Sequence, residues 1–302
     1  MADTVLVTGC SSGIGRATAR AFLADGWTTY ATARDPGDLT GLADRGAETT
    51  RLDVTDPADA RLVVARVEEE QGAIDCLVNV AGYGQFGPVE DVPTELVEEQ
   101  LAVNAVGPHR LMRAVLPAMR ERDAGRIVNV TSAGDRLALA GIGVYNGSKM
   151  ALAGMTDALR QELAHTGVEV VVVQPGAVAT PFYDRALAEV ERADGSRTYS
   201  HLYRALRRIR AVEAGGPGIA EPETVAATIL DAATDQNPDT HYRVSQLSLL
   251  GSLYGTLVPG TVRDLLTRLA IRAVASGPVQ RWLTRREEAA DREPASPDRR
   301  HL

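Results

Sequence analysis

The sequence has too few cysteines for a disulfide framework. Only two of its 302 residues are cysteine, Cys10 and Cys76. Both fall in segments that we expect to belong to a buried sheet, which fits a reducing compartment better than a disulfide-stapled secreted protein. The cytoplasm is therefore the expected location.

The sequence also lacks a long apolar run. The segment from Val244 to Val258 contains Gln246 and several Ser and Gly residues, and Pro259 follows it. It falls short of the ~20 apolar residues that a transmembrane helix needs. The first four residues lead directly into a strand, without the basic and apolar regions of a secretory signal. We expect neither a transmembrane segment nor a cleaved signal.

Basic residues are fewer than acidic ones, 32 against 40, so the formal net charge is -8. Nucleic-acid affinity rests largely on Lys and Arg side chains that neutralise phosphates, so we expect no nucleic-acid partner. Metal-ligand spacing between two His residues, or between His and Cys, is also missing, so no metal site is expected. The five histidines are His109, His165, His201, His241 and His301.

Short β-branched runs alternate with helical stretches along the chain. The runs are nearly continuous in apolar residues, as expected of strands that are covered on both faces of a parallel sheet. Expected strands lie at 5–7, 28–30, 74–80, 127–130 and 170–173, and expected helices at 16–24, 57–70, 95–120 and 145–165. The alternation predicts an α/β fold with a single doubly wound Rossmann-type parallel sheet and helices on both faces.

We expect one domain over residues 1–285, because open α/β sheets of about 250 residues commonly form one domain. Its polar segment 181–218 follows a late strand and would form a substrate lid beside the ligand crevice. Residues 244–285 alternate apolar and basic positions and predict a C-terminal helical extension. Packing on the same molecule is a simpler interpretation of that extension than contact with a membrane surface. Residues 286–302 have the composition of a disordered tail.

A glycine-rich loop follows the first expected strand and opens the first helix. Glycines permit a tight turn and let backbone N–H groups approach a pyrophosphate at the positive end of a helix. The spacing is Gly-x-x-x-Gly-x-Gly, and its position between a strand and a helix supports dinucleotide binding over a purely structural turn. The candidate binding residues are Gly9, Ser11, Ser12, Gly13, Ile14 and Gly15.

The end of the second strand bears on which dinucleotide would bind. An NAD-binding protein normally has a carboxylate there to accept hydrogen bonds from the adenosine ribose. Here Ala33 and Arg34 stand at that point, and Asp35 comes one residue late. Arg34 can pair with a 2′-phosphate through its planar fork of donors, so NADP(H) is favoured over NAD(H). The alternative is a surface arginine without a cofactor contact.

A second signal is the pair Tyr145 and Lys149, which the i, i+4 spacing puts on one face of a helix. A free tyrosine has a pKa near ~10 and is a poor base at neutral pH unless a positive charge favours the phenolate. Lys149 would supply that charge. Such a pair is common by chance, so its weight depends on the other motifs.

Taken together, these motifs resemble the short-chain dehydrogenase/reductase family of the roughly 250-residue type, over about the first 240 residues. The Tyr-Ala-Thr-Ala-Arg-Asp stretch and the long C-terminal region are most similar to its steroid- and retinol-processing branch. The resemblance assigns a catalytic tetrad to Asn104, Ser132, Tyr145 and Lys149. It implies that Ser132 orients the substrate, Tyr145 transfers the proton, Lys149 holds the nicotinamide ribose, and Asn104 supports a proton-relay water.

The resemblance implies further cofactor contacts. Asp53 and Val54 match the adenine-side contact, and Asn79 to Gly82 match an Asn-Asn-Ala-Gly motif in which the second Asn is Val80 here. Residues 175–180 match the segment that grips the carboxamide. The contacts carried over are Asp53, Val54, Asn79, Ala81, Gly82, Pro175, Gly176, Val178 and Thr180. The family also implies a homodimer or homotetramer.

Apolar side chains surround the expected crevice and favour a hydrophobic ketone or alcohol as substrate. Leu137, Leu139 and Ile142 lie between the serine and the tyrosine, and Gln85-Phe86 and Phe182-Tyr183 are expected to border the same space. The resulting hypothesis is an NADP(H)-dependent ketoreductase or alcohol dehydrogenase. Two alternatives are a non-catalytic NADP-binding regulator, against which the intact tetrad speaks, and a lyase or epimerase on the same fold.

Overall fold

A seven-stranded sheet forms the centre of the computed structural model, which describes residues 2–190, 192, 195–207, 218–244, 254–255 and 257–275. The strand order is β3-β2-β1-β4-β5-β6-β7, and all neighbouring strands are parallel. This confirms the expected doubly wound α/β fold. The strands are β1 (Thr4–Val7), β2 (Thr28–Ala33), β3 (Glu48–Arg51), β4 (Cys76–Asn79), β5 (Gly125–Val130), β6 (Val168–Gln174) and β7 (His241–Arg243).

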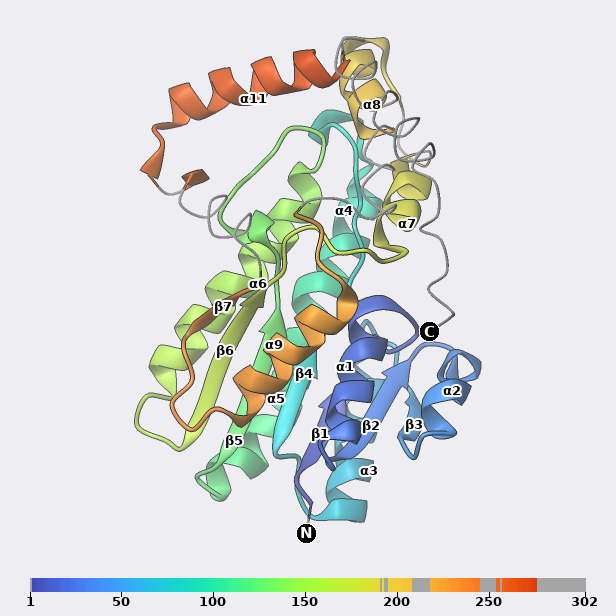
Figure 1. Cartoon of the computed structure of the whole chain (residues 1–302), viewed down its shortest axis with the longest axis vertical. Helices are drawn as coiled ribbons and strands as arrows, with labels where there is room; N and C mark the ends of the chain where they lie inside the picture. Colours follow the sequence, from blue (N-terminus) through green and yellow to red (C-terminus); the bar gives the residue numbers. More distant parts are fainter. Residues whose placement is uncertain are drawn as a thin grey trace, which may run out of the picture.

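Helices cover both faces of the sheet (Figure 1). On one face, α1 (Gly13–Ala24) and α9 (Pro222–Thr234) pack against each other, and α3 (Pro57–Gln71), α5 (Gly107–Glu121) and α6 (Gly143–Glu162) lie on the other. The central strand β1 shows why its sequence is continuously apolar. Val5 and Val7 join the core beneath α1 and α9, whereas Leu6 joins the core beneath α3 and α5. Both faces of the strand are buried, so alternation is absent.

The sequence patterns missed both edge strands. β3 consists of half-buried and exposed residues, and β7 is three residues long and only half-buried. An edge strand faces water on one side and therefore lacks the apolar run by which the central strands were recognised.

The helix expected at 95–120 is wrong as a single element. It consists of α4 (Thr94–Leu101), a π-helical turn (Ala102–Val106) and α5. Pro108 follows this turn and has no N–H to give to the carbonyl of Asn104, so the regular helical bonding pattern is interrupted there. The irregular turn is where Asn104 is located.

Three further helices lie beyond the carboxyl ends of the strands, namely α7 (Phe182–Val190), α8 (Ser200–Leu206) and α11 (Gly260–Ala275) (Figure 1). α11 packs against α8. Parts of the expected lid (191, 193–194 and 208–217) and of the expected extension (245–253, 256 and 276–285) lie outside the described residues, as does the whole expected tail. The short helices elsewhere are α2 (Thr40–Ala43), η1 (Pro36–Leu39), η2 (Val89–Asp91), η4 (Ala133–Asp135) and η5 (Arg197–Tyr199).

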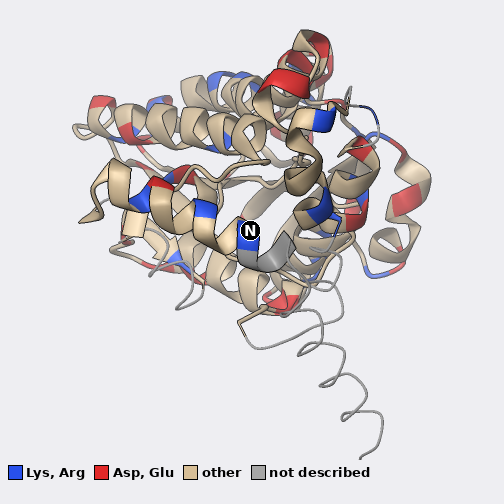
Figure 2. Ribbon diagram, turned by 90° about the horizontal axis from the view of Figure 1, so that it is seen from above, with Lys and Arg blue, Asp and Glu red and all other residues tan. Residues whose placement is uncertain are grey.

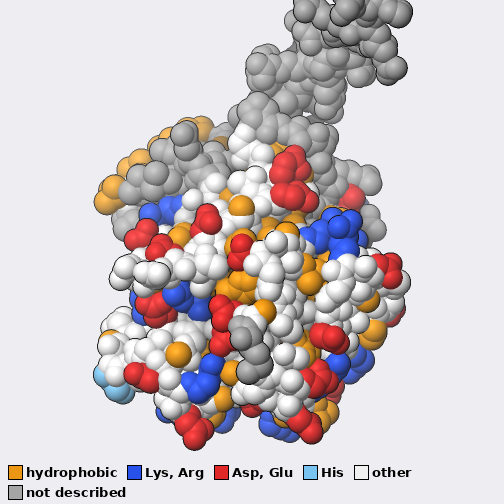
Figure 3. Space-filling model, turned by 60° about the horizontal axis from the view of Figure 1, so that its bottom comes forward, with side chains coloured by type: hydrophobic (Ala, Val, Ile, Leu, Met, Phe, Trp, Pro, Cys, Tyr) orange, Lys and Arg blue, Asp and Glu red, His pale blue; other side chains and the backbone are white. Residues whose placement is uncertain are grey.

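Charged residues of both signs are spread over the outer helices (Figure 2). The face in Figure 3 likewise shows basic and acidic side chains interspersed, with no patch of one sign dominating it. Among the helices that the structure describes, none is both long and apolar enough to cross a membrane.

Candidate active site

The strands β1, β2, β4, β5 and β6 end at a cavity of about 1150 Å³. In open α/β sheets this carboxyl edge is where ligands bind. Nearly every site residue proposed from the sequence lines the cavity: Gly9, Ser11, Ser12, Gly13, Ile14, Gly15, Arg34, Asp53, Val54, Ala81, Gly82, Ser132, Tyr145, Lys149, Pro175, Gly176, Val178 and Thr180. Asn79 and Asn104 are placed elsewhere.

The glycine-rich loop turns so tightly that its glycine positions leave little room for a side chain. Gly9 and Gly13 have φ angles of 73° and 52°, which favour glycine. A Cβ on Gly15 would lie 2.2 Å from the Gly9 carbonyl oxygen. Ser12, the N-cap of α1, makes no side-chain capping bond, so this helix end presents its first N–H groups to the cavity. The loop therefore fits a bound pyrophosphate.

Two loops meet across the cavity from this glycine turn. A Cβ on Gly13 would lie 3.0 Å from Cγ2 of Thr180, so the segment after β6 approaches the start of α1 closely. On the other side, Thr8 Oγ1 accepts hydrogen bonds from the backbone nitrogens of Val80 and Ala81, each at 3.0 Å. These contacts hold the loops after β1, β4 and β6 around one space.

Arg34 is exposed and lines the cavity directly after β2. Asp35 is occupied as the N-cap of η1, where its Oδ1 accepts a hydrogen bond from the Gly37 nitrogen at 2.8 Å. Nearby, Asp53 accepts bonds from the nitrogen and hydroxyl of Thr55. The Thr55 hydroxyl bond is the main reason that the pKa of Asp53 is lowered, and the positive charge of Arg34 lowers it further. Arg34 thus presents a charged donor to the cavity at this end of the sheet.

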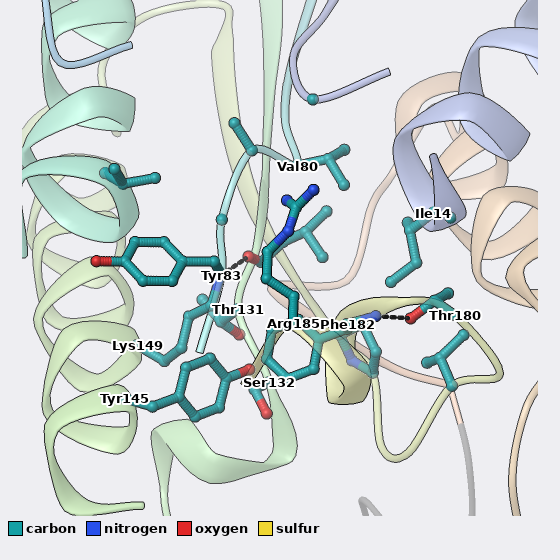
Figure 4. Close-up of a pocket in the computed structure, with 18 of the residues that line it drawn as sticks. Ile14, Val80, Tyr83, Thr131, Ser132, Tyr145, Lys149, Thr180, Phe182 and Arg185 are labelled. Atoms are coloured by element: carbon teal, nitrogen blue, oxygen red, sulfur yellow. Dashed lines mark hydrogen bonds between the residues drawn. The ribbon is translucent and has the colours of Figure 1, made fainter. Parts of the chain in front are cut away.

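Tyr145 and Ser132 meet in the deeper part of the cavity. Tyr145 lies in the first turn of α6, and Ser132 follows β5. Their hydroxyls point toward one another (Figure 4), and the Ser132 hydrogen bond lowers the pKa of the phenol. Burial is the larger effect and raises that pKa above its ordinary value. The expectation that the phenol is acidified is therefore wrong for this structure, because desolvation outweighs the favourable contacts.

Lys149 is the only lysine in the sequence. Its side chain is almost fully buried, and its Nζ donates a hydrogen bond to the Val130 carbonyl oxygen at 3.0 Å. Burial lowers its pKa to about 8. The ammonium thus loses its proton at a much lower pH than an exposed lysine does.

Asn104 lies behind the wall of the cavity. Its Nδ2 donates to the Tyr83 carbonyl oxygen (2.9 Å) and to Ser148 Oγ (3.0 Å), and its Oδ1 accepts from the Tyr83 nitrogen. A Cβ on Gly82 would lie 3.1 Å from Asn104 Oδ1 and 3.4 Å from Lys149 Nζ. Asn104 and Lys149 therefore both lie close to Gly82, and a side chain there would crowd both of them.

Asn79 lies below the cavity in the interior of the sheet. Its Nδ2 donates to Asn129 Oδ1 at 2.8 Å, and Asn129 in turn donates to Thr156 of α6. The chain Asn79-Asn129-Thr156 links β4 and β5 to the helix that carries Tyr145. Asn79 therefore stabilises the strands and the helix that carry the site and does not line the cavity.

Aromatic rings cover Tyr145. Phe86 and Phe182 are two of the three phenylalanines in the sequence, and both lie edge-on or tilted to the Tyr145 ring, at centroid distances of 6.0 and 5.4 Å. Tyr183 packs on Phe182. The expectation for Gln85 is wrong: it is fully buried away from the cavity, and its amide donates to the carbonyl oxygens of Phe86 and Glu189.

Sequence reasoning missed several residues at the site. Arg185 of α7 reaches into the cavity (Figure 4), and Arg192 pairs with Glu189 (2.7 Å) and with Glu99 (3.5 Å), joining the end of α7 to α4. Asp135 is a further residue that the sequence motifs do not identify. The available signal is a carboxylate three residues after Ser132, in the loop that also carries Leu137 and Leu139.

The described residues contain no group of three or more His, Cys, Asp or Glu side chains arranged to hold a metal ion. Cys10 and Cys76 are free and fully buried, and burial raises the pKa of both thiols to about 12. Neither thiol has the properties of a reactive nucleophile.

Comparison with known proteins gives a consistent result. The family model described as short chain dehydrogenase matches residues 3–190. An uncharacterized oxidoreductase, YbbO, of Escherichia coli K12 is 32% identical over 87% of this chain and 93% of its own. Human 17-beta-hydroxysteroid dehydrogenase type 1 is 36% identical over 80% of this chain and 77% of its own. The crystal structure of a short-chain dehydrogenase from Streptomyces avermitilis superposes with a TM-score of 0.75 at 32% identity, covering 90% and 98% of the two chains.

Proposed function

The chain belongs to the short-chain dehydrogenase/reductase family, and we propose that it reduces bulky apolar ketones with NADPH. It is an oxidoreductase whose fold binds a nicotinamide cofactor. The observation that carries the proposal is the position of Tyr145. Its phenol meets Ser132 inside a cavity that also contains the glycine-rich loop, Lys149 and a set of aromatic rings.

The cofactor supplies the hydride. Gly9 to Gly15 would hold its pyrophosphate at the start of α1, and Val178 and Thr180 would hold its carboxamide. Lys149 lines the same cavity and would bind the nicotinamide ribose. The close approach of Thr180 to Gly13 supports a single extended binding site along these residues.

Tyr145 is proposed as the proton donor to the ketone oxygen. Burial keeps its pKa high, so the phenol is protonated at neutral pH and ready to donate. Ser132 would donate a hydrogen bond to the same substrate oxygen and so fix it beside Tyr145. After the transfer, the Lys149 ammonium would stabilise the phenolate electrostatically. Asn104 holds the backbone of Tyr83 behind these groups.

The preference for NADPH is proposed from Arg34. Neither neighbour of Arg34 competes for the adenosine ribose at the end of β2, because Ala33 is apolar and Asp35 caps η1. The guanidinium of Arg34 is exposed at the cavity and complements a doubly negative 2′-phosphate.

The apolar substrate is proposed from the side chains around Tyr145. Phe86, Phe182 and Tyr183 form one wall, and Leu137, Leu139 and Ile142 line the loop before α6. Such a wall favours a fused or extended hydrocarbon with one carbonyl group over a sugar. Similarity to a 17-beta-hydroxysteroid dehydrogenase supports a polycyclic substrate.

Location and assembly are part of the proposal. Two buried free thiols support a reducing compartment, and we place the enzyme in the cytoplasm. We also propose a homodimer or homotetramer, which light scattering on the purified protein would distinguish from a monomer.

The test is a panel of apolar ketones and alcohols assayed with NADPH and NADH. We expect NADPH oxidation with at least one ketone, and Tyr145→Phe should remove turnover by a factor of ~10³ or more while the Kd for NADPH stays within about twofold. Tyr199→Phe, which changes a phenol outside the cavity, is the control. Unchanged turnover in Tyr145→Phe would overturn the mechanism.

A further inference from the structure

Asp135 is a buried carboxylate that takes no direct part in the proposed proton transfer to the ketone. It ends η4, three residues after Ser132, and its side chain is 0% exposed. Burying a carboxylate is costly unless hydrogen bonds or charges compensate it. In this protein the compensation comes from residues at the edge of the active site.

Hydrogen bonds tie Asp135 to the ends of two strands. Thr131, directly before Ser132, donates its hydroxyl to Oδ2 at 2.5 Å. Gln174, the last residue of β6, donates its amide to Oδ1 at 2.7 Å and to Oδ2 at 2.9 Å. β5 leads into the loop that carries Ser132, and β6 leads into the segment from Pro175 to Thr180. One carboxylate therefore joins the two loops that would hold substrate and carboxamide.

Backbone contacts reinforce the same junction. The nitrogen of Asp135 donates to the Ser132 carbonyl oxygen at 3.0 Å, and the nitrogen of Ala133 donates to the Pro175 carbonyl oxygen at 2.8 Å. Ser132 Oγ accepts from the Gly134 nitrogen at 3.1 Å. The turn that positions the Ser132 hydroxyl is thus built around Asp135.

The charge of Asp135 also acts on the catalytic groups. Lys149 donates to Val130, and Asp135 binds the next residue, Thr131, so both are anchored at the end of β5. Burial lowers the pKa of Lys149, and the negative charge of Asp135 opposes that effect. The same charge raises the pKa of Tyr145, after the larger effect of burial.

Other charged groups near Asp135 are largely engaged elsewhere. Arg136 Nε is 4.0 Å from Asp135 Oδ1, but its Nη2 donates to Asp157 of α6 at 3.0 Å. His241 of β7 also lies nearby, with its Nε2 3.4 Å from Asp157 Oδ1. Burial raises the pKa of Asp135, and the bonds from Thr131 and Gln174 lower it. The three hydrogen bonds that it accepts favour the ionised form, although burial is the larger effect and keeps the pKa of this carboxyl above its ordinary value.

We propose that Asp135 is a positioning residue of this active site, which clamps the ends of β5 and β6 together and provides the buried negative charge that balances the Lys149 ammonium. The proposal rests on the function proposed above. Asp135 contacts neither substrate nor cofactor in this scheme and acts through Ser132 and Lys149.

The single lysine allows a direct test that needs no substrate. Protein grown with ¹³C-labelled lysine gives one Hε–Cε signal, whose titration reports the Lys149 pKa. In Asp135→Asn we expect this pKa to fall by about half a pH unit to one pH unit. The amide can replace the carboxylate sterically. Gln174 Oε1 has no hydrogen-bond partner among the described residues, so it is available to accept from the introduced amide after a rotation.

Two control variants separate charge from structure. Asp157→Asn also removes one carboxylate charge, from a residue of α6 that pairs with Arg136 and Arg160. It should leave the Lys149 pKa within about 0.2 pH units of the wild type. Thr131→Val removes one bond of the clamp and keeps the Asp135 side chain in place. It should raise KM for the ketone several-fold, and it should lower the Lys149 pKa by no more than Asp135→Asn does.

An unchanged Lys149 titration in a folded Asp135→Asn protein would overturn the proposal, as would a shift no larger than that of Asp157→Asn. Thermal unfolding of each variant shows whether it is folded. If the titration shifts as expected but no ketone is reduced by the wild type, the proposed substrate fails while the role of Asp135 at Lys149 stands.

Discussion

The phenyl ring of Phe182 lies 5.4 Å from the ring of Tyr145, centroid to centroid, with the two planes at 59°. Phe182 begins α7, the first helix of the segment expected to form the lid, and its ring also packs 6.1 Å from that of Phe86. Desolvation is the main cause of the raised Tyr145 pKa. The ring of Phe182, at the start of α7, therefore contributes to the burial of the phenol.

Phe182→Ala should weaken binding of a bulky apolar ketone, because it removes an apolar wall of the cavity. Burial of such a ring is worth about 1.5–3 kcal/mol, so KM should rise by roughly tenfold or more. The phenol should also titrate at lower pH once water reaches it. Steady-state kinetics with the preferred ketone measures the first effect. Leu62→Ala, which truncates an exposed apolar residue on α3, is the control; equal KM values in both variants would contradict the expected role.

Arg34→Ala should weaken NADPH much more than NADH. Loss of a charge-assisted contact to the 2′-phosphate is expected to raise the Kd for NADPH by roughly 10- to 100-fold and to leave that for NADH within about twofold. Fluorescence titration with both cofactors measures this. Arg45→Ala removes another exposed arginine outside the cavity lining and should change neither value. Similar losses for both cofactors would indicate a general defect of the loop.

The pH dependence of ketone reduction should follow Lys149. Its pKa in the folded protein is lowered by burial to about 8. Below this pH the side chain is an ammonium that stabilises the phenolate; above it the charge is lost. We therefore expect kcat/KM to be level near neutrality and to fall as the pH rises through about 8. A profile that stays level up to pH ~10, the ordinary range of lysine, would contradict this assignment.

Two glycine substitutions should have opposite effects. A Cβ on Gly15 would collide with the Gly9 carbonyl oxygen at 2.2 Å, so Gly15→Ala should lower the Tm by several degrees and abolish measurable cofactor binding. Gly154 lies within α6, is exposed and has open space around its Cβ position. Gly154→Ala should stabilise the protein by about 0.5–1 kcal/mol and leave cofactor binding intact. Calorimetry and titration of both variants check this contrast, which fails if Gly15→Ala still binds NADPH normally.

Local patterns in the sequence were sufficient for the centre of the fold. The continuous apolar runs of β1, β4, β5 and β6 follow from burial on both faces, a property that each short segment carries by itself. The glycine-rich loop and the Tyr145–Lys149 spacing are also contained within a few consecutive residues. Ser132 and Asn104, in contrast, were identified from the family resemblance and not from local chemistry.

Only the tertiary structure decided what contacts each polar group. The edge strands β3 and β7 have no apolar signature, and their pairing depends on the neighbours that the sheet provides. Asn79 bonds to Asn129, and Asp135 to Gln174, which is 39 residues away in sequence. The tertiary structure also reversed the expected shift of the Tyr145 pKa, which is raised and not lowered. The sequence places a lysine one helical turn from the phenol, but desolvation depends on Phe86 and Phe182, which reach Tyr145 only when distant segments pack together.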